Sequence, residues 1–251
     1  MTQDARGAAT AASSPTIHRV RALDLRVVPW RWRFADERRD QIAAHFEACR
    51  AKVPQIWNGP ILLGCSRALS GETLSASYFQ TDFASFLAWR DWGFPDTSVF
   101  NGFGMGALRA SDGAYVLGVM GPHTANAGRV YFAAGTPDLS DVAGDRLDIP
   151  GSVAREVEEE IGLVPSDYEA APDWHVVIDH TRIAMMRVLR SPLSGAELKR
   201  KIEETLAGQV APELSAIRLV YGPQDFTGAM PGFVTAFLIH MFSAPDGARD
   251  L

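Results

Sequence analysis

The spacing of apolar residues along the chain alternates between the two-residue period of a half-buried strand and the longer period of an amphipathic helix. Strand-like runs come first, separated by turn residues such as Ser70-Gly71 and Ser111-Asp112-Gly113. Strands and helices then alternate, an order that favours an α/β sandwich with helices on both faces of a mixed sheet. The pattern predicts a hairpin over residues 61–79 and strands over residues 17–32, 102–109, 115–120, 129–133, 175–179, 183–189 and 217–221. It predicts helices over residues 36–52, 83–92, 153–161, 194–206 and 231–242.

The strand predicted over residues 102–109 carries alternate glycines, Gly102, Gly104 and Gly106. A glycine-rich phosphate loop of the P-loop type would need a Lys-Ser/Thr ending and a following helix, and this run has neither. We therefore expect these glycines to let another element pack closely against the strand.

Composition and charge narrow the range of functions. The net charge of −6 over 251 residues argues against a protein that coats nucleic acid through a basic face. No apolar run approaches the roughly 18 residues that span a bilayer, so no membrane partner is expected. Two cysteines, Cys49 and Cys65, are too few for a disulfide framework. They are expected to be buried small apolar residues in a reducing, cytoplasmic setting.

The segment from Arg155 to Leu163 holds the most informative polar pattern in the chain. On a helix, Glu156, Glu159 and Glu160 occupy positions i, i+3 and i+4, so their carboxylates share one face. Such like charges repel one another, and a hard divalent cation such as Mg²⁺ or Mn²⁺ removes the conflict. Arg155 is expected to hold one of these carboxylates in place.

The other face of this helix is apolar, with Val153, Val157 and Ile161 placed to pack on a sheet. Gly162 is placed to end the helix in the left-handed conformation. A simpler interpretation of the glutamates is also open. Acidic residues near a helix N-terminus are favoured by the helix dipole, and an acidic helical face is usually just solvated.

The same residues resemble the second half of the Nudix box, R-E-aliphatic-x-E-E-x-G-aliphatic, at every specified position from Arg155 to Leu163. The resemblance implies an α/β/α sandwich around a mixed β-sheet. It also implies an enzyme that cleaves a phosphoanhydride bond with Mg²⁺ or Mn²⁺. By residue-wise match, Arg155, Glu156 and Glu159 take catalytic roles. Glu156, Glu159 and Glu160 bind the metal, and Glu160 is the first choice as a direct ligand.

The first half of the box departs from the family pattern, which expects a glycine, five residues, a glutamate and seven residues before the Arg-Glu pair. Here Gly135 follows a strand and Asp141 stands at the glutamate position, but thirteen residues separate Asp141 from Arg155. The box therefore carries a six-residue insertion and a Glu-to-Asp change. Gly135 and Arg129, which precedes the same strand, are expected to contact the substrate.

Scattered N-terminal positions, including Trp57-Asn58-Gly59 before a strand, resemble the UDP-sugar pyrophosphatase branch of the family. This resemblance implies a nucleotide sugar as a candidate substrate, and the family makes a homodimer a candidate assembly. The expected organisation is a flexible tail at residues 1–15, an N-terminal α+β extension at 16–100 and a Nudix hydrolase domain at 101–251.

The favoured function is hydrolysis of a nucleoside diphosphate linked to another moiety, with this small molecule as the partner. Two alternatives stay open: a Nudix-fold protein that binds a nucleotide or metabolite without turnover, and a structural protein whose glutamates are surface charge. The water-activating base is also open, with His175, Asp179 and His180 as candidates around a strand that follows the helix.

Overall fold

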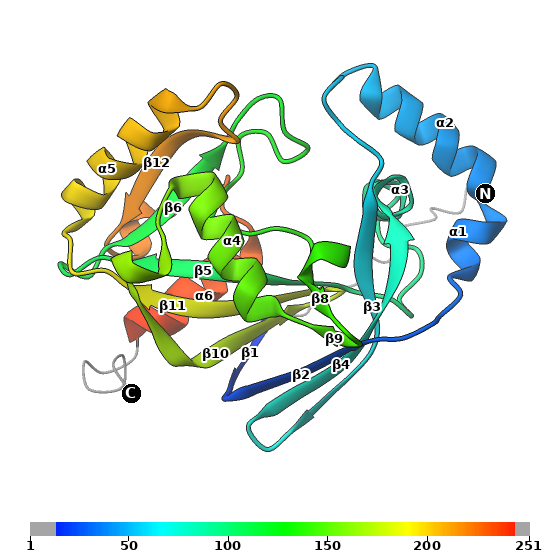
Figure 1. Cartoon of the computed structure of the whole chain (residues 1–251), viewed down its shortest axis with the longest axis horizontal. Coiled ribbons are helices and arrows are strands. Elements are labelled where there is room, and N and C mark those ends of the chain that lie inside the picture. The colour runs from blue at the N-terminus through cyan, green and yellow to red at the C-terminus, as the bar shows by residue number, and fades with distance from the viewer. Residues whose placement is uncertain (1–13, 244–251) are drawn as a thin grey trace, which may run out of the picture.

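Two β-sheets organise the computed structural model, which describes residues 14–243 (Figure 1). Nearly all of the expected flexible tail therefore lies outside the described residues. The larger sheet has seven strands, in the order β1 (Thr16–Val20), β10 (Glu169–Asp179), β11 (Arg182–Arg190), β5 (Asn101–Arg109), β6 (Tyr115–Met120) and β12 (Leu214–Val220), with the short β7 (Val130–Tyr131) paired to β6. The smaller sheet has five, in the order β3 (Pro60–Ser70), β4 (Thr73–Asp82), β2 (Ala22–Val27), β9 (Arg146–Leu147) and β8 (Val142–Ala143).

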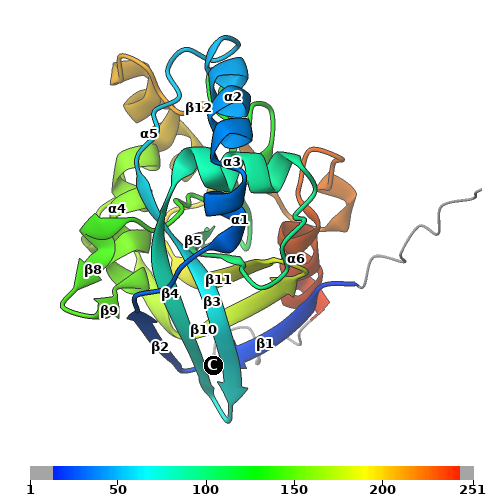
Figure 2. The same cartoon turned by 90° about the vertical axis from the view of Figure 1, so that its right-hand side faces the viewer.

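Helices cover both faces of the larger sheet, which confirms the predicted α/β/α sandwich (Figure 2). On one face, α4 (Ile149–Ile161) and α5 (Gly195–Gly208) enclose an apolar core that includes Val153 and Val157. On the other face, α6 (Gly232–Ser243) buries Phe233 and Phe237 against the sheet. Within residues 14–243, no helix has the length and apolar character needed to cross a lipid bilayer.

The N-terminal region has a core of its own, at the right of Figure 1. The helices α1 (Arg33–Glu37), α2 (Arg39–Arg50) and α3 (Phe83–Asp91) pack against β3 and β4 around an aromatic cluster. Asp82 caps the start of α3, because its side chain accepts the N–H of Ser85 at 2.9 Å.

The hairpin predicted around Ser111-Asp112-Gly113 opens soon after its turn. β5 and β6 pair with each other at Arg109 and Tyr115, next to the turn. Away from the turn, the segment that begins with β7 lies between the two strands. β7 pairs with β6, and Ala133 bridges to Gly106 of β5. The opening brings the residues that follow β7 into the sheet directly under α4, where the candidate site lies.

β5 accommodates α4 because two of its three glycines leave room for side chains of the helix. A Cβ atom added to Gly104 would lie 2.6 Å from Cγ2 of Val153, and one added to Gly106 would lie 2.6 Å from Cγ2 of Val157. Ordinary van der Waals contact of a Cβ atom begins near 3.4 Å. The expectation that these glycines permit close packing against the strand is confirmed.

α4 begins at Ile149, four residues before the predicted start at residue 153. Pro150 sits in the first turn, where its missing N–H costs nothing, and the side chain of Asp148 accepts the N–H of Gly151 at 3.0 Å. The predicted start at residue 153 was therefore wrong, because the proline and glycine before it belong to the first turn of the helix. The other end agrees with the prediction, since Gly162 has φ 69°.

The six-residue insertion forms the hairpin of β8 and β9. The N–H of Asp148 donates to the carbonyl of Asp141 at 2.8 Å, so the two ends of the hairpin meet. β9 adds to the smaller sheet, where Arg146 pairs with Arg26 of β2. β1, in turn, joins the larger sheet beside β10. The two sheets thus exchange strands across the expected boundary at residue 100, and the extension is not separated from the rest at that point.

The close packing of α4 on β5 makes a prediction about stability. Gly106→Ala places a methyl group where Val157 and Leu189 already lie, within 2.9 Å of both. We expect it to lower the free energy of unfolding by about 1–3 kcal/mol, the usual cost of overpacking a core, measured by urea denaturation. The matched control is Gly208→Ala at the end of α5, where a Cβ meets no atom within 4 Å. Equal stability of the two variants would contradict the packing argument.

Candidate functional site

Three glutamates of α4 line one cavity of about 350 Å³. They are Glu156, Glu159 and Glu160, so the spacing that places them on one helical face also points them into one space. The opposite wall comes from the segment between α5 and β12. The remaining lining residues are Gln209, Val210, Ala211 and Glu213.

The position of these glutamates along α4 excludes the helix dipole as their explanation. Because the helix begins at Ile149 and ends at Ile161, Glu159 and Glu160 lie in its last turn. That end of a helix carries partial negative charge and favours cations, so carboxylates there are destabilising. The site therefore gathers negative charge at the end of α4 where the helix dipole disfavours it.

Glu160 is the most buried of the three, with 5% of its surface exposed. Its Oε1 accepts the backbone N–H of Ala134 at 3.2 Å. Its Oε2 is buried and has no hydrogen-bond partner among residues 14–243. Burial raises the pKa of this carboxyl to about 9, and the charges of Glu156 and Glu213 add to the effect. A buried carboxylate oxygen without a donor is suited to bind a divalent cation.

Glu156 lies directly against Gly135. A Cβ atom added to Gly135 would lie 2.2 Å from Oε1 of Glu156, so the glycine leaves the space that this carboxylate fills. Burial raises the pKa of Glu156 to about 7, opposed by the charge of Arg155. From the sequence we predicted that Gly135 contacts the substrate. In the structure, Gly135 directly adjoins Glu156 of the site. A set of oxygen donors with so little competing positive charge fits Mg²⁺ or Mn²⁺.

Arg155 fixes the carboxylates by touching three of them. Its guanidinium lies 3.0 Å from Asp141, 2.9 Å from Glu156 and 3.3 Å from Glu159. Burial by itself would lower the pKa of Arg155, but the hydrogen bond to Asp141 and the charge of Glu156 raise it on balance. The expected bracing role of Arg155 thus has a geometric basis in three ion pairs.

Asp141 occupies the position of the box that the insertion placed in doubt. Its side chain is buried, accepts the N–H of Asp138 and pairs with Arg155. The inserted hairpin begins after Asp141 and ends before Asp148, and these two residues are hydrogen-bonded to each other. The insertion therefore does not move Asp141 away from the start of α4. Excising residues 142–147 leaves the seven residues 148–154 before Arg155, the spacing of the family pattern.

Glu213 completes the cavity, and sequence reasoning missed it. It stands just before β12, far from the box in sequence and without a motif around it. Its carbonyl accepts the N–H of Gly121 at 2.6 Å, which holds the segment in place, and its exposed side chain lines the cavity. The available signal was an acidic residue four residues before the strand predicted at 217–221, and such a residue is too common to indicate a site.

Other expected site residues lie elsewhere. Arg129 is exposed and is not among the residues that line the cavity. His175 packs on the opposite face of the sheet, 5.5 Å from the ring of Phe237 in α6, and burial lowers its pKa to about 4. Asp179 pairs with Arg182 at 2.7 Å at the end of the same strand. The histidine is therefore a packed structural residue in this fold.

The Trp57-Asn58-Gly59 run has a local structural explanation. Oδ1 of Asn58 accepts the N–H of Ala84 at 2.8 Å at the start of α3. A Cβ atom on Gly59 would lie 2.1 Å from the ring of Trp57, so the glycine makes room for the indole. Trp57 itself is 75% exposed. These contacts account for the run without reference to a substrate.

Comparison with known proteins gives weak similarities. No protein-family model matches the sequence, and no curated protein does. A solved Nudix hydrolase from M. Smegmatis, RenU, is 14% identical, with 59% of this chain and 91% of that chain covered and a TM-score of 0.38. The MutT protein from Methanosarcina mazei Go1 is 17% identical, with coverage of 56% and 91% and a TM-score of 0.36. The function proposed below rests on the residues of this chain.

The buried carboxyl of Glu160 predicts how the metal-free protein responds to pH. Its pKa is raised from 4.5 to about 9 on folding, so the folded state prefers the protonated form. The free energy of unfolding therefore has its full value below pH 4.5, and ionisation of Glu160 lowers it progressively as the pH rises toward 9. We expect Glu160→Gln to remove this loss, so that in EDTA its melting temperature exceeds that of the wild type by at least roughly 2 °C at the alkaline end.

The matched control is Glu158→Gln, a change at an exposed glutamate on the same helix. It should follow the wild-type profile at every pH. Added Mg²⁺ or Mn²⁺ should narrow the difference between wild type and Glu160→Gln, because the cation offsets the buried charge. Parallel pH profiles for wild type and Glu160→Gln would contradict the assignment.

Proposed function

We propose that this protein is a hydrolase that uses Mg²⁺ or Mn²⁺ to cleave a phosphoanhydride bond in a nucleoside diphosphate linked to another moiety. The observation that carries the proposal is the convergence of Glu156, Glu159, Glu160 and Glu213 on one cavity, with a buried oxygen of Glu160 left unpartnered. The resemblance of residues 155–163 to the Nudix box supports the same reaction.

In this proposal some residues of the chain bind the metal and another residue accepts a proton. Glu156, Glu159 and Glu160 hold the metal, and Arg155 positions two of these carboxylates through its ion pairs. Glu213, exposed on the facing wall, takes the proton from the attacking water. When bound, the metal ions supply neutralisation of the diphosphate charge and activation of the water.

The proposed substrate is a small molecule with two linked phosphates, and nucleotide sugars are the first class to examine. Hydrolysis would release a nucleoside monophosphate and a phosphorylated remainder. The proposal includes Arg129 as a contact to the distal part of such a substrate, because its exposed guanidinium precedes the strand that leads to Gly135.

The first test measures release of phosphorylated products from a panel of nucleotide sugars, dinucleotides and nucleoside triphosphates with Mg²⁺ or Mn²⁺. We expect turnover of one class by the wild type and a fall in kcat of roughly 100-fold or more in Glu160→Gln, because a direct metal ligand is lost. Glu158→Gln, on the same helix but outside the cavity, should keep wild-type activity.

Retention of full metal-dependent activity by Glu160→Gln would refute the proposed site. Silence of the wild type across the panel would refute catalysis on these substrates. In that case, tight binding of one panel member under Mg²⁺ would identify a binding protein of the same fold.

A second test uses Gly135, whose missing side chain leaves space for Glu156. Gly135→Ala pushes a methyl group against the Glu156 carboxylate, which lies at the end of a flexible side chain and can move. We expect kcat to fall roughly 10–100-fold, because small displacements at a reacting centre are costly. The melting temperature in EDTA should change by less than about 2 °C. Unchanged activity would show that the position of Glu156 is not critical.

A further inference from the structure

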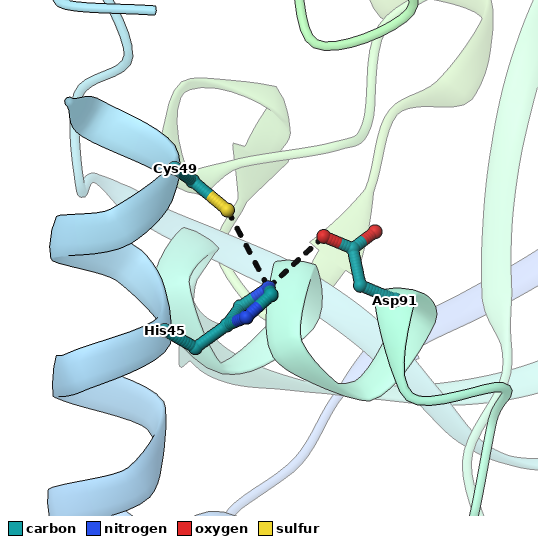
Figure 3. Close-up of side chains that lie close together, drawn as sticks. All are labelled: His45, Cys49 and Asp91. Atoms are coloured by element: carbon teal, nitrogen blue, oxygen red, sulfur yellow. Dashed lines mark hydrogen bonds and ion pairs between the residues drawn. The ribbon is translucent and has the colours of Figure 1, made fainter. Parts of the chain in front are cut away.

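Three side chains of different chemistry converge between α2 and α3, away from the carboxylate cavity (Figure 3). His45 and Cys49 are four residues apart on α2 and share one face of the helix. Asp91 is the last residue of α3. Nε2 of His45 lies 3.0 Å from Oδ2 of Asp91 and 3.5 Å from Sγ of Cys49. All three atoms lie within 4.8 Å of one another.

The arrangement is not that of a nucleophilic cysteine with its base. In such a triad the thiol and the carboxylate engage opposite nitrogens of the imidazole, so that the ring relays a proton between them. Here the thiol and the carboxylate both approach the same nitrogen, Nε2 of His45. One ring nitrogen cannot serve both partners with its single proton or lone pair. Three donor atoms that face one point are instead the geometry of a metal site.

We propose that His45, Cys49 and Asp91 bind a transition-metal ion of the zinc class, with water in the fourth position. Donor atoms bound to zinc at about 2.0–2.3 Å in a tetrahedron lie roughly 3.3–3.6 Å from one another. The separation of 3.5 Å between Nε2 and Sγ already falls in this range, and that of 3.0 Å between Nε2 and Oδ2 is slightly shorter. Small side-chain rotations would complete the site.

The surrounding structure holds these donors in place and leaves them accessible. The side chains of His45 and Asp91 are 23% and 30% exposed, so an ion can enter from solvent. Oδ1 of Asp91 accepts Nε–H of Arg90 at 2.9 Å, which leaves Oδ2 turned toward the histidine. The ring of Trp92 packs 5.7 Å from that of His45. Such supporting contacts commonly orient metal ligands.

This site would select a different metal from the carboxylate cavity. Thiolate and imidazole donors favour zinc, cobalt and their neighbours, whereas carboxylates favour magnesium and manganese. The two sites can therefore be loaded independently, and the proposal does not depend on the proposed hydrolase activity. Sequence reasoning expected Cys49 to be a buried apolar residue, but it is half-buried, forms no disulfide and lies beside His45. The third donor lies on another helix, so no local spacing revealed the cluster.

The test titrates Co²⁺ into the reduced full-length protein, freed of any purification tag, with saturating Mg²⁺ present to fill the carboxylate cavity. Co²⁺ bound to a thiolate gives a charge-transfer band in the near ultraviolet, and tetrahedral Co²⁺ gives intense visible bands. We expect both to appear with one equivalent of Co²⁺ and to disappear when Zn²⁺ is added.

The decisive variants are Cys49→Ser and the matched control Cys65→Ser, a change at the other free cysteine of the chain. Cys49→Ser should lose the charge-transfer band, and Cys65→Ser should keep it. Asp91→Asn, which preserves the shape of the side chain, should weaken Zn²⁺ binding by at least roughly tenfold in competition with a chromophoric chelator. Circular dichroism melts confirm that each variant is folded before its titration counts.

Absence of the thiolate band in the wild type would overturn the proposal, as would its persistence in a folded Cys49→Ser protein. Should Cys49→Ser fail to fold, the Asp91→Asn titration decides, and unchanged Zn²⁺ affinity there would also overturn it. Loss of the band in Cys65→Ser alone would assign the thiolate ligand to Cys65 of β3 and would overturn the proposal.

Discussion

The packing of α4 against β5 is the constraint from which the geometry of the carboxylate cavity follows. Gly104 and Gly106 remove the side chains that would hold the helix away, so Val153 and Val157 fill the space above the strand. At this separation, the chain that enters between β5 and β6 runs directly under the helix. Ala134 then reaches Glu160 with its N–H, and Gly135 lies against Glu156. A helix a few ångströms further out would leave both glutamates in solvent.

The same packing creates an electrostatic conflict that the metal-free fold resolves only in part. Carboxylates lie at the negative end of α4, and burial raises the pKa of Glu156 and Glu160. Arg155 offsets part of the charge through Asp141, Glu156 and Glu159. Glu160 has no such partner. The cost in stability is concentrated on one cavity. Such a cost is expected where residues serve ligand binding rather than the stability of the fold.

Sequence reasoning recovered what is encoded locally. The i, i+3, i+4 spacing placed Glu156, Glu159 and Glu160 on one face, and the alternate glycines of β5 predicted a close neighbour. It failed where distant segments meet. Glu213 comes near the glutamates of α4 only through tertiary structure, and the same is true of Asp91 and His45. The start of α4 was missed because Pro150 and Gly151 are typical of loops, although both suit a first helical turn.

The hairpin of β8 and β9 links the segment before α4 to the N-terminal sheet. It lengthens the chain between Asp141 and α4 and also supplies strands to the N-terminal sheet, where the carbonyl of Asp145 accepts the N–H of Val27 at 2.8 Å. Arg146 and Asp24 add an ion pair across the same edge at 3.2 Å. Without the extension, the hairpin would present an unpaired edge to solvent. Without the hairpin, the extension would lose its border strands. The hairpin and the N-terminal strands therefore depend on each other for hydrogen-bonded edges, and removal of either is expected to destabilise the other.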